Sequence, residues 1–199
     1  DFMTKTAAPM TSGSIWKQMT FFAMPIFLGN LFQQLYNTVD SLIVGNFLGS
    51  SALAAVSSSG SLIFMLIGFL SGISAGAGVI VARFFGAGDE KNLQRAVHTT
   101  VAFGLVAGVL MTGVGVALSP QILRWMDTPE SVMRESVTYL QIYFAGSLGF
   151  VMYNVLVGIL QAVGDSRHPL YYLIVSSVIN LVLDLLFITG FHTGVGGAA

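Results

Sequence analysis

Two carboxylates lie within apolar stretches of the chain that otherwise contain no charge. Asp40 follows 22 uncharged residues that begin after Lys17, and Asp184 lies in the last apolar stretch. A carboxylate in the hydrocarbon core of a membrane costs about 2.5 to 3.5 kcal/mol on insertion scales, so such residues usually face a cavity and mark an ion or proton path. Carboxyl oxygens can take up a proton, or bind Na⁺ as hard oxygen ligands do for other cations. The two residues therefore predict a site for either H⁺ or Na⁺.

Each carboxylate ends a stripe of polar residues spaced three or four apart, which places the members of a stripe on one face of a helix. The stripes consist of Gln33, Tyr36, Asn37 and Asp40, and of Ser177, Asn180 and Asp184. We expect Asp40, Asn180 and Asp184 to bind the cation or proton, and Gln33, Tyr36, Asn37 and Ser177 to line a cavity beside them. The alternative is that each Asp only pairs with a polar neighbour and holds helices together.

The elements that position these residues are predicted to be membrane-spanning helices. The chain of 199 residues is 54% apolar and only 9% charged, whereas an ordinary soluble domain has about 25% charged residues. Its mean hydropathy is +0.80. Long uncharged stretches exceed the ~20 residues that a helix needs to cross the bilayer, and backbone groups in lipid must be hydrogen-bonded within the segment. We predict an all-α, polytopic helix bundle with spans at Trp16 to Val44, Ala52 to Arg83, Leu93 to Leu118, Val132 to Val163 and Pro169 to Thr189.

The distribution of basic residues predicts the orientation of the bundle, because Lys and Arg collect in cytoplasmic connections. Six flank the N-terminal side, namely Lys5, Lys17, Arg83, Lys91, Arg95 and Arg167, and two, Arg124 and Arg134, flank the other. The N-terminus is therefore expected in the cytoplasm, with the protein in the inner cell membrane. Counted back from Gly45 and Gly190, Asp40 and Asp184 then lie about 8 to 9 Å below the outer helix ends, in one layer.

Other features of the sequence limit the possible functions. There is no cysteine and the net charge is −1, so disulfides, thiolate metal sites and nucleic-acid binding are not expected. No P-loop, nucleotide fingerprint or catalytic triad pattern is present, and the three histidines have no partner at metal-ligand spacing. We expect no enzyme, no resident metal and no cofactor other than the coupling ion. Pro25 lies inside the first span and predicts a kink, either a hinge or a fixed bend.

Glycines at intervals of four predict close helix packing. They are Gly68, Gly72 and Gly76 on the second span and Gly104 and Gly108 on the third. Asp1 and Phe2, ahead of Met3, are expected to be residues added before the natural start. Residues 1–14 are predicted to be a tail, and residues 15–199 one bundle that stops before a sixth helix.

Five segments of the chain, taken in order, carry a resemblance to a known family. They are residues 40–55 (DSLIVGNFLGSSALAA), 82–89 (ARFFGAGD), 164–169 (GDSRHP), 180–184 (NLVLD) and 194–199 (GVGGAA). Together they resemble the multidrug and toxic compound extrusion (MATE) family, most closely the prokaryotic branch that includes the DNA-damage-inducible F proteins. The resemblance implies twelve helices in two lobes, of which this chain is the N-terminal lobe, with the C-terminal lobe as its partner.

The same resemblance implies a function and a site. Members exchange H⁺ or Na⁺ for amphipathic, usually cationic compounds, which would make small organic cations the substrates. The family's cation site matches Asp40, Asn180 and Asp184, and bending of the first helix at Pro25 belongs to a proposed transport cycle. The alternatives are a lipid-linked sugar flippase of the same superfamily, which would favour a cationic lumen, and a membrane scaffold that transports nothing.

Overall fold

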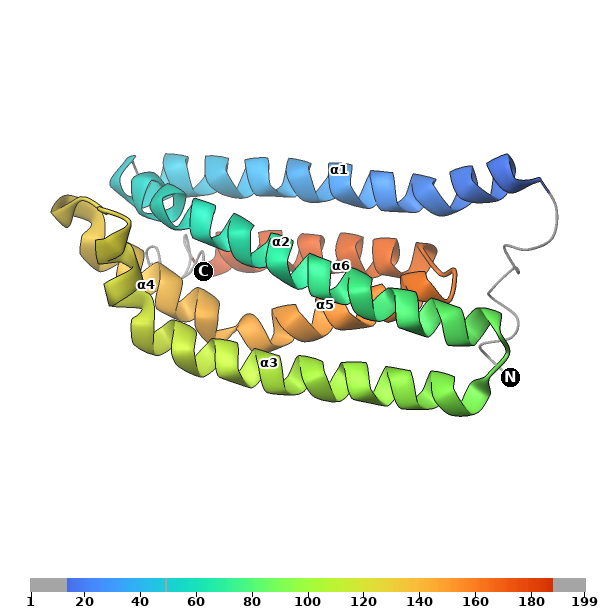
Figure 1. Cartoon of the computed structure of the whole chain (residues 1–199). Coiled ribbons are helices and arrows are strands. Elements are labelled where there is room, and N and C mark those ends of the chain that lie inside the picture. The colour runs from blue at the N-terminus through green and yellow to red at the C-terminus, as the bar shows by residue number, and fades with distance from the viewer. Residues whose placement is uncertain (1–13, 49, 188–199) are drawn as a thin grey trace.

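The computed structural model describes residues 14–48 and 50–187, and its regular structure in these ranges is helical (Figure 1). The helices are α1 (Ile15–Leu48), α2 (Ser50–Gly86), α3 (Glu90–Trp125), α4 (Glu130–Ala145), α5 (Ser147–Ala162) and α6 (Arg167–Leu185). This arrangement confirms the predicted all-α helix bundle. Lys5 and the glycine-rich segment 194–199 lie outside the described residues.

Long apolar helices make up much of the bundle. Within the described residues, Ser59–Gly86 and Glu90–Trp125 are each long and apolar enough to cross a membrane, and α4 and α5 together meet the same test as one bent span. Helix α1 has 34 residues, a length of about 51 Å at 1.5 Å per residue. A helix of that length must tilt in a bilayer or extend beyond it.

The predicted span from Val132 to Val163 consists of two helices, and the break between them was not predicted. The chain breaks at Gly146, where α4 and α5 meet at a bend of 48°. Gly and Ser pairs are common sites of sharp kinks, and here Gly146 precedes Ser147. The hydroxyl oxygen of Ser147 lies 2.9 Å from that of Thr112 on α3, at hydrogen-bond distance, which anchors the first turn of α5. We call this break the elbow.

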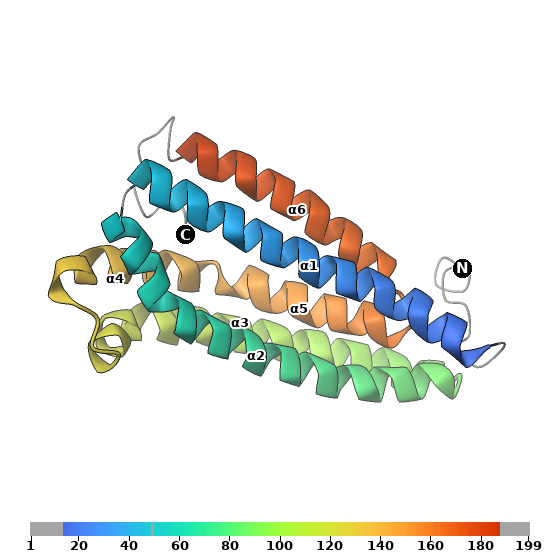
Figure 2. The same cartoon turned by 90° about the horizontal axis from the view of Figure 1, so that it is seen from above.

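The helices run side by side along the long axis of the lobe, and their connections gather at two ends (Figures 1 and 2). One end holds the start of α1 together with the α2–α3 and α5–α6 turns, and the other holds the α1–α2 connection and the α3–α4 turn. We name them the inner end and the outer end, after the predicted orientation. Helices α1 and α6 pack against each other and run in the same direction, from the inner to the outer end.

Close packing of α3 against α5 depends on Gly104 and Gly108, as the sequence predicted. A Cβ atom at Gly104 would lie 2.9 Å from Val155 Cγ2, and one at Gly108 would lie 2.6 Å from Leu148 Cδ1. The prediction for Gly68, Gly72 and Gly76 is wrong within the described chain, since a Cβ at these positions would meet nothing within 4 Å. Helix α2 instead approaches α5 on another face, where Ser74 lies beside Gly158.

Both turns at the inner end use the dipeptide Gly-Asp. Gly88 and Gly164 have φ of 67° and 88°, the left-handed conformation that glycine adopts without strain at the end of a helix. The Asp that follows caps the next helix: Asp89 accepts from the Asn92 backbone N–H at 3.1 Å and from its side-chain amide at 2.7 Å. Asp165 likewise accepts from two backbone N–H groups at the start of α6.

The Asp89 cap gives a testable pH dependence. Hydrogen bonds from the Asn92 side chain, and then from its backbone, lower the pKa of Asp89 below its ordinary value of 3.8. A carboxyl whose pKa is lower in the folded state stabilises it fully above the ordinary value, and this contribution is lost as the pH falls through the lowered pKa. We expect Asp89→Ala to speed amide hydrogen exchange at Asn92 at neutral pH, and to change it little below the lowered pKa, where the parent protein has lost the carboxylate cap as well. Asp89→Asn keeps a side-chain acceptor and should change the exchange little; equal effects of both variants would contradict a capping role.

Candidate functional site

The polar stripes of α1 and α6 meet because the two helices are parallel and in register. The Tyr36 hydroxyl donates a hydrogen bond to the Asn180 side-chain oxygen, which joins positions 144 residues apart. Nearer the inner end, a Cβ at Gly29 would lie 3.5 Å from a methyl carbon of Leu173, an ordinary contact. The two helices are therefore in contact at both levels, and the Tyr36 and Asn180 hydrogen bond joins their polar stripes.

The register places the backbones of Asp40 and Asp184 at matching levels. Each lies four residues beyond the Tyr36 and Asn180 contact, and 184 minus 40 gives the same offset of 144 residues. Four residues advance a helix by about 6 Å, slightly more than one turn. Asp184 is buried, with 4% of its surface exposed, while the side chain of Asp40 lies outside the described part. That the two carboxyl groups meet stays a prediction.

A cavity of about 690 Å³ opens between α1, α2, α5 and α6 on the inner side of the Tyr36 and Asn180 contact. Its polar walls come from α1, α2, α5 and the α5–α6 turn, through Asn30, Gln33, Ser71, Ser74, Tyr153, Asn154, Gln161 and Ser166. Apolar surface between them includes Phe22, Ile26 and Phe150. None of the described residues that line this cavity carries a formal charge. Its walls suit an amphipathic molecule with an apolar ring system and hydrogen-bonding groups.

The structure places the predicted site residues unequally. Gln33 and Pro25 line the cavity, and α1 continues as a helix through Pro25. Tyr36 is half-buried at its contact with Asn180. Asn37 is exposed, and its backbone carbonyl accepts from the Ser41 hydroxyl at 2.9 Å. Ser177 is half-buried on α6 and, like Tyr36 and Asn37, is not among the residues that line this cavity.

The walls formed by α2 and α5 were not predicted from the sequence. Asn30 extends the α1 stripe by one more step of three residues from Gln33, and this spacing could have identified it. Asn154 and Gln161 lie seven residues apart on α5, which is two helical turns and one face. Ser71 and Ser74 gave no comparable signal, because short hydroxyl side chains are common in membrane helices as packing residues.

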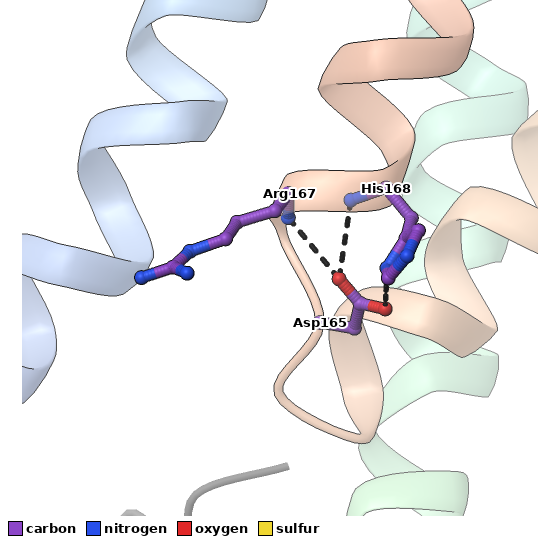
Figure 3. Close-up of polar contacts among 3 residues, drawn as sticks. All are labelled: Asp165, Arg167 and His168. Carbon is purple, nitrogen blue, oxygen red and sulfur yellow. Dashed lines mark hydrogen bonds and ion pairs between the residues drawn. The ribbon is translucent and has the colours of Figure 1, made fainter. Parts of the chain in front are cut away.

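The α5–α6 turn borders the cavity through Ser166, and Figure 3 shows the polar contacts of this turn. Asp165 Oδ1 accepts from the backbone N–H groups of Arg167 and His168, both at 3.2 Å. Asp165 Oδ2 lies 2.5 Å from His168 Nδ1. Two residues of the same segment, Ser166 and Pro169, line the cavity. The cap therefore fixes the position of α6 where it forms the cavity wall.

Comparison with known proteins adds the following similarities. A family model described as MatE matches residues 25–186. The chain is 38% identical over 177 residues to the Bacillus subtilis protein named "Probable multidrug resistance protein YoeA", a match that covers 89% of this chain and 38% of that protein. It is 28% identical over 188 residues to "DNA damage-inducible protein F" of Escherichia coli, covering 92% and 40%.

Solved structures show the same fold. One, described as the outward-facing conformation of a multidrug resistance MATE family transporter of the MOP superfamily, aligns with a TM-score of 0.88 and 27% identity, over 98% of this chain and 43% of that one. The chain thus spans about two fifths of the length of the relatives that it matches. Within the described residues, no group of three or more His, Cys, Asp or Glu side chains could hold a metal ion.

Proposed function

The chain belongs to the MatE family, as its ordered motifs predicted, and we propose that it forms one lobe of a multidrug efflux antiporter. Members of this family are transporters and not enzymes. The proposed transporter takes H⁺ or Na⁺ inward and exports amphipathic, mostly cationic compounds. Asp40, Asn180 and Asp184 form its cation or proton site. The observation that carries the proposal is the shared register of α1 and α6, which joins Tyr36 to Asn180 and sets both acids one turn beyond.

The chemistry of this site follows from burial and the choice of ligands. Two carboxyl groups close together in a poorly hydrated site cannot both hold a full charge without a cation or a proton between them. Their protons then come off as a coupled pair, so that each occupied state belongs to the pair. The Asn180 amide oxygen, which already accepts from Tyr36, gives the site a neutral oxygen ligand. Ion binding therefore acts directly on the contact between α1 and α6.

The cavity is the proposed place for the exported compound. It lies on the inner side of the Tyr36 and Asn180 contact and contains Pro25 on its α1 wall. Pro25 removes one backbone hydrogen bond from α1, so a change in the α1–α6 contact can bend the helix at this point. We propose that ion binding repacks α1 around Pro25 and changes the shape of the cavity.

The driving force is large enough for export. One elementary charge that crosses 100 mV releases about 2.3 kcal/mol, which corresponds to a concentration ratio of about fiftyfold per ion. A pH or Na⁺ gradient of the same direction adds to this ratio. This ratio applies where one net charge moves inward, as when one ion is exchanged for one uncharged compound or two ions for one singly charged cation. A one-for-one exchange of monovalent cations moves no net charge and is driven by the pH or Na⁺ gradient alone.

The proposed setting is the inner cell membrane, with the inner end in the cytoplasm. The helix ends that meet at the inner end (Figures 1 and 2) carry Lys17, Arg83, Lys91, Arg95 and Arg167, as expected for cytoplasmic connections. The second lobe is the proposed partner, because the relatives are more than twice as long as this chain. Small organic cations are the proposed substrates.

Labelling with a hydrophobic carbodiimide tests this proposal. Such reagents attack a protonated carboxyl group in an apolar site, so we expect labelling at Asp40 or Asp184 that rises as the pH falls. Na⁺ should protect the site if Na⁺ is the coupling ion, and an exported cation should protect it in either case. Asp127, which is exposed in the α3–α4 turn, serves as the carboxyl control. Labelling that is unaffected by pH, Na⁺ and substrate would contradict a coupling site and favour the scaffold alternative.

A further inference from the structure

Exposed basic side chains are concentrated at the inner end of the lobe. They are Lys17 on α1, Arg83 on α2, Lys91 and Arg95 on α3, and Arg167 on α6. We call them the inner basic cluster. Among the described residues, the outer end has only Arg124 and Arg134. The helix ends that carry the inner basic cluster lie at the same end of the lobe in both views (Figures 1 and 2).

The acidic residues of the inner end neutralise this cluster only in part, and Asp89 interacts electrostatically with Arg95. Asp89 is occupied as a helix cap by Asn92, and Asp165 by two backbone N–H groups and His168. The one ion pair found in the part of the chain that the structure describes joins His168 to Asp165. Figure 3 shows the Arg167 guanidinium pointing away from the Asp165 carboxylate. Five exposed cations against the three carboxylates Asp89, Glu90 and Asp165 leave an excess of two positive charges at the inner end. At the outer end, Arg124 and Arg134 are outnumbered by Asp127, Glu130 and Glu135.

The two tryptophans place the cluster relative to a bilayer. Trp16 is 81% exposed in the first turn of α1, and Trp125 is 72% exposed at the end of α3, at opposite ends of the lobe. Exposed tryptophans of membrane proteins lie at the level of the lipid headgroups. Lys17 follows Trp16 directly, so the inner basic cluster lies at the depth of lipid phosphates.

We propose that the inner basic cluster binds the headgroups of anionic phospholipids. Lys and Arg form charge-assisted hydrogen bonds with phosphate oxygens, and clusters of four to eight such residues beside a membrane helix attract anionic lipids. The five cations belong to four helices, and none of them lines the cavity. That spread suits a surface of many headgroups and not a single soluble anion in a pocket. Bound lipids would thereby hold the inner ends of α1, α2, α3 and α6 at one depth.

The positions of the two tryptophans provide the experiment, because the chain contains only these two. Trp125→Phe leaves Trp16 as the reporter of the inner end, and Trp16→Phe leaves Trp125 as the reporter of the outer end. Each variant is placed in vesicles whose phosphatidylglycerol or phosphatidylcholine carries brominated acyl chains, which quench tryptophan on contact. We expect the anionic lipid to quench Trp16 about twofold more than the zwitterionic lipid does, from the attraction of several basic residues. Trp125 should show a ratio close to one.

Charge variants decide whether the cluster causes the preference. Lys91→Gln, Arg95→Gln and Arg167→Gln together should bring the Trp16 ratio close to one, and about 0.5 M NaCl should lower it as well. The matched control is Arg124→Gln with Arg134→Gln at the outer end, which should leave the Trp16 ratio unchanged. Far-ultraviolet circular dichroism checks that each variant keeps its helices.

Several results would overturn the proposal. The first is an equal ratio of anionic to zwitterionic quenching at Trp16 and Trp125. The second is a Trp16 preference for the anionic lipid that survives the triple substitution. The third is a loss of this preference in inorganic phosphate that NaCl of equal ionic strength does not reproduce. The last result would identify a soluble anion as the ligand. The proposal rests on the membrane placement given above and not on ion coupling. Asp184→Asn should therefore keep the lipid preference even where it abolishes transport, and the two proposals can fail separately.

Discussion

Replacing Asp184 with Asn is expected to abolish ion-coupled efflux while the helix bundle still inserts and folds. Asn has nearly the same shape as Asp, but it can neither take up a proton nor hold a charge opposite Na⁺. At one-for-one exchange with H⁺, the concentration ratio of an exported cation should fall from about tenfold per pH unit of gradient to about one. Asp40→Asn should have the same effect, since the α1–α6 register places its backbone at the same level. The measurement is accumulation of a fluorescent cation in inverted vesicles that contain the full-length transporter with this lobe.

The control for this prediction is Asp127→Asn in the exposed α3–α4 turn. Asp127 has a φ of 52°, a conformation that Asn tolerates well, so this variant should fold and transport as the parent protein does. Equal efflux by the parent protein and the Asp184→Asn variant would show that coupling resides elsewhere. Loss of efflux in the Asp127 control as well would point to a general folding defect and not to the site.

Replacing Gly115 with Ala is expected to destabilise the lobe more than any other single-methyl change described above. A Cβ at this position would lie 2.1 Å from Cδ1 and 2.3 Å from Cγ of the Phe144 ring. Phe144 is only 3% exposed and belongs to a core cluster with Leu123 and Leu140, so the ring has no free space to enter. Overpacking of this kind typically destabilises by about 1 to 3 kcal/mol. Unfolding of the purified protein in mixed detergent micelles measures the loss.

The same helix offers a matched control at Gly113. A Cβ there would meet nothing within 4 Å, so Gly113→Ala should leave stability unchanged or raise it slightly, because Ala favours a helix over Gly by about 1 kcal/mol. Phe144→Leu combined with Gly115→Ala should recover part of the loss by making room for the new methyl group. If both Gly variants changed stability equally, helix propensity and not the contact with Phe144 would explain the effect.

The helices were predictable from the sequence because hydropathy and charge are local properties. Uncharged stretches located α1, α2 and α3 to within a few residues at most ends. The elbow was missed because Gly146 and Ser147 lie in an uninterrupted apolar run. Whether such a pair bends a helix depends on a neighbour that can hold the new first turn, and here that neighbour is Thr112, 35 residues away.

The candidate site was predictable on the two helices that carry polar stripes and not on the others. Spacing along the helix identified the faces of Gln33 and Asn180, and counting from the helix ends predicted one depth for the two acids. The cavity itself depends on how α2 and α5 lie against α1 and α6, so Tyr153 and Asn154 could not be assigned to it from the sequence. The same limit applies to the glycines of α2, whose spacing indicated packing on a face that the described helices leave open.

The elbow at Gly146 also decides how the lobe can be rotated about the membrane normal. Ser147 is fully buried, and its hydroxyl lies against α3, but Ala145 and Gly146 are exposed, so this lobe alone does not cover the irregular backbone. Lipid tolerates an interrupted helix only where protein or a water-filled space covers the interruption. The side of α3 turned away from the elbow exposes Phe103, Val106 and Leu110, and this side is left to meet the lipid tails. Gly146 thereby limits which side of the lobe can face the lipid tails.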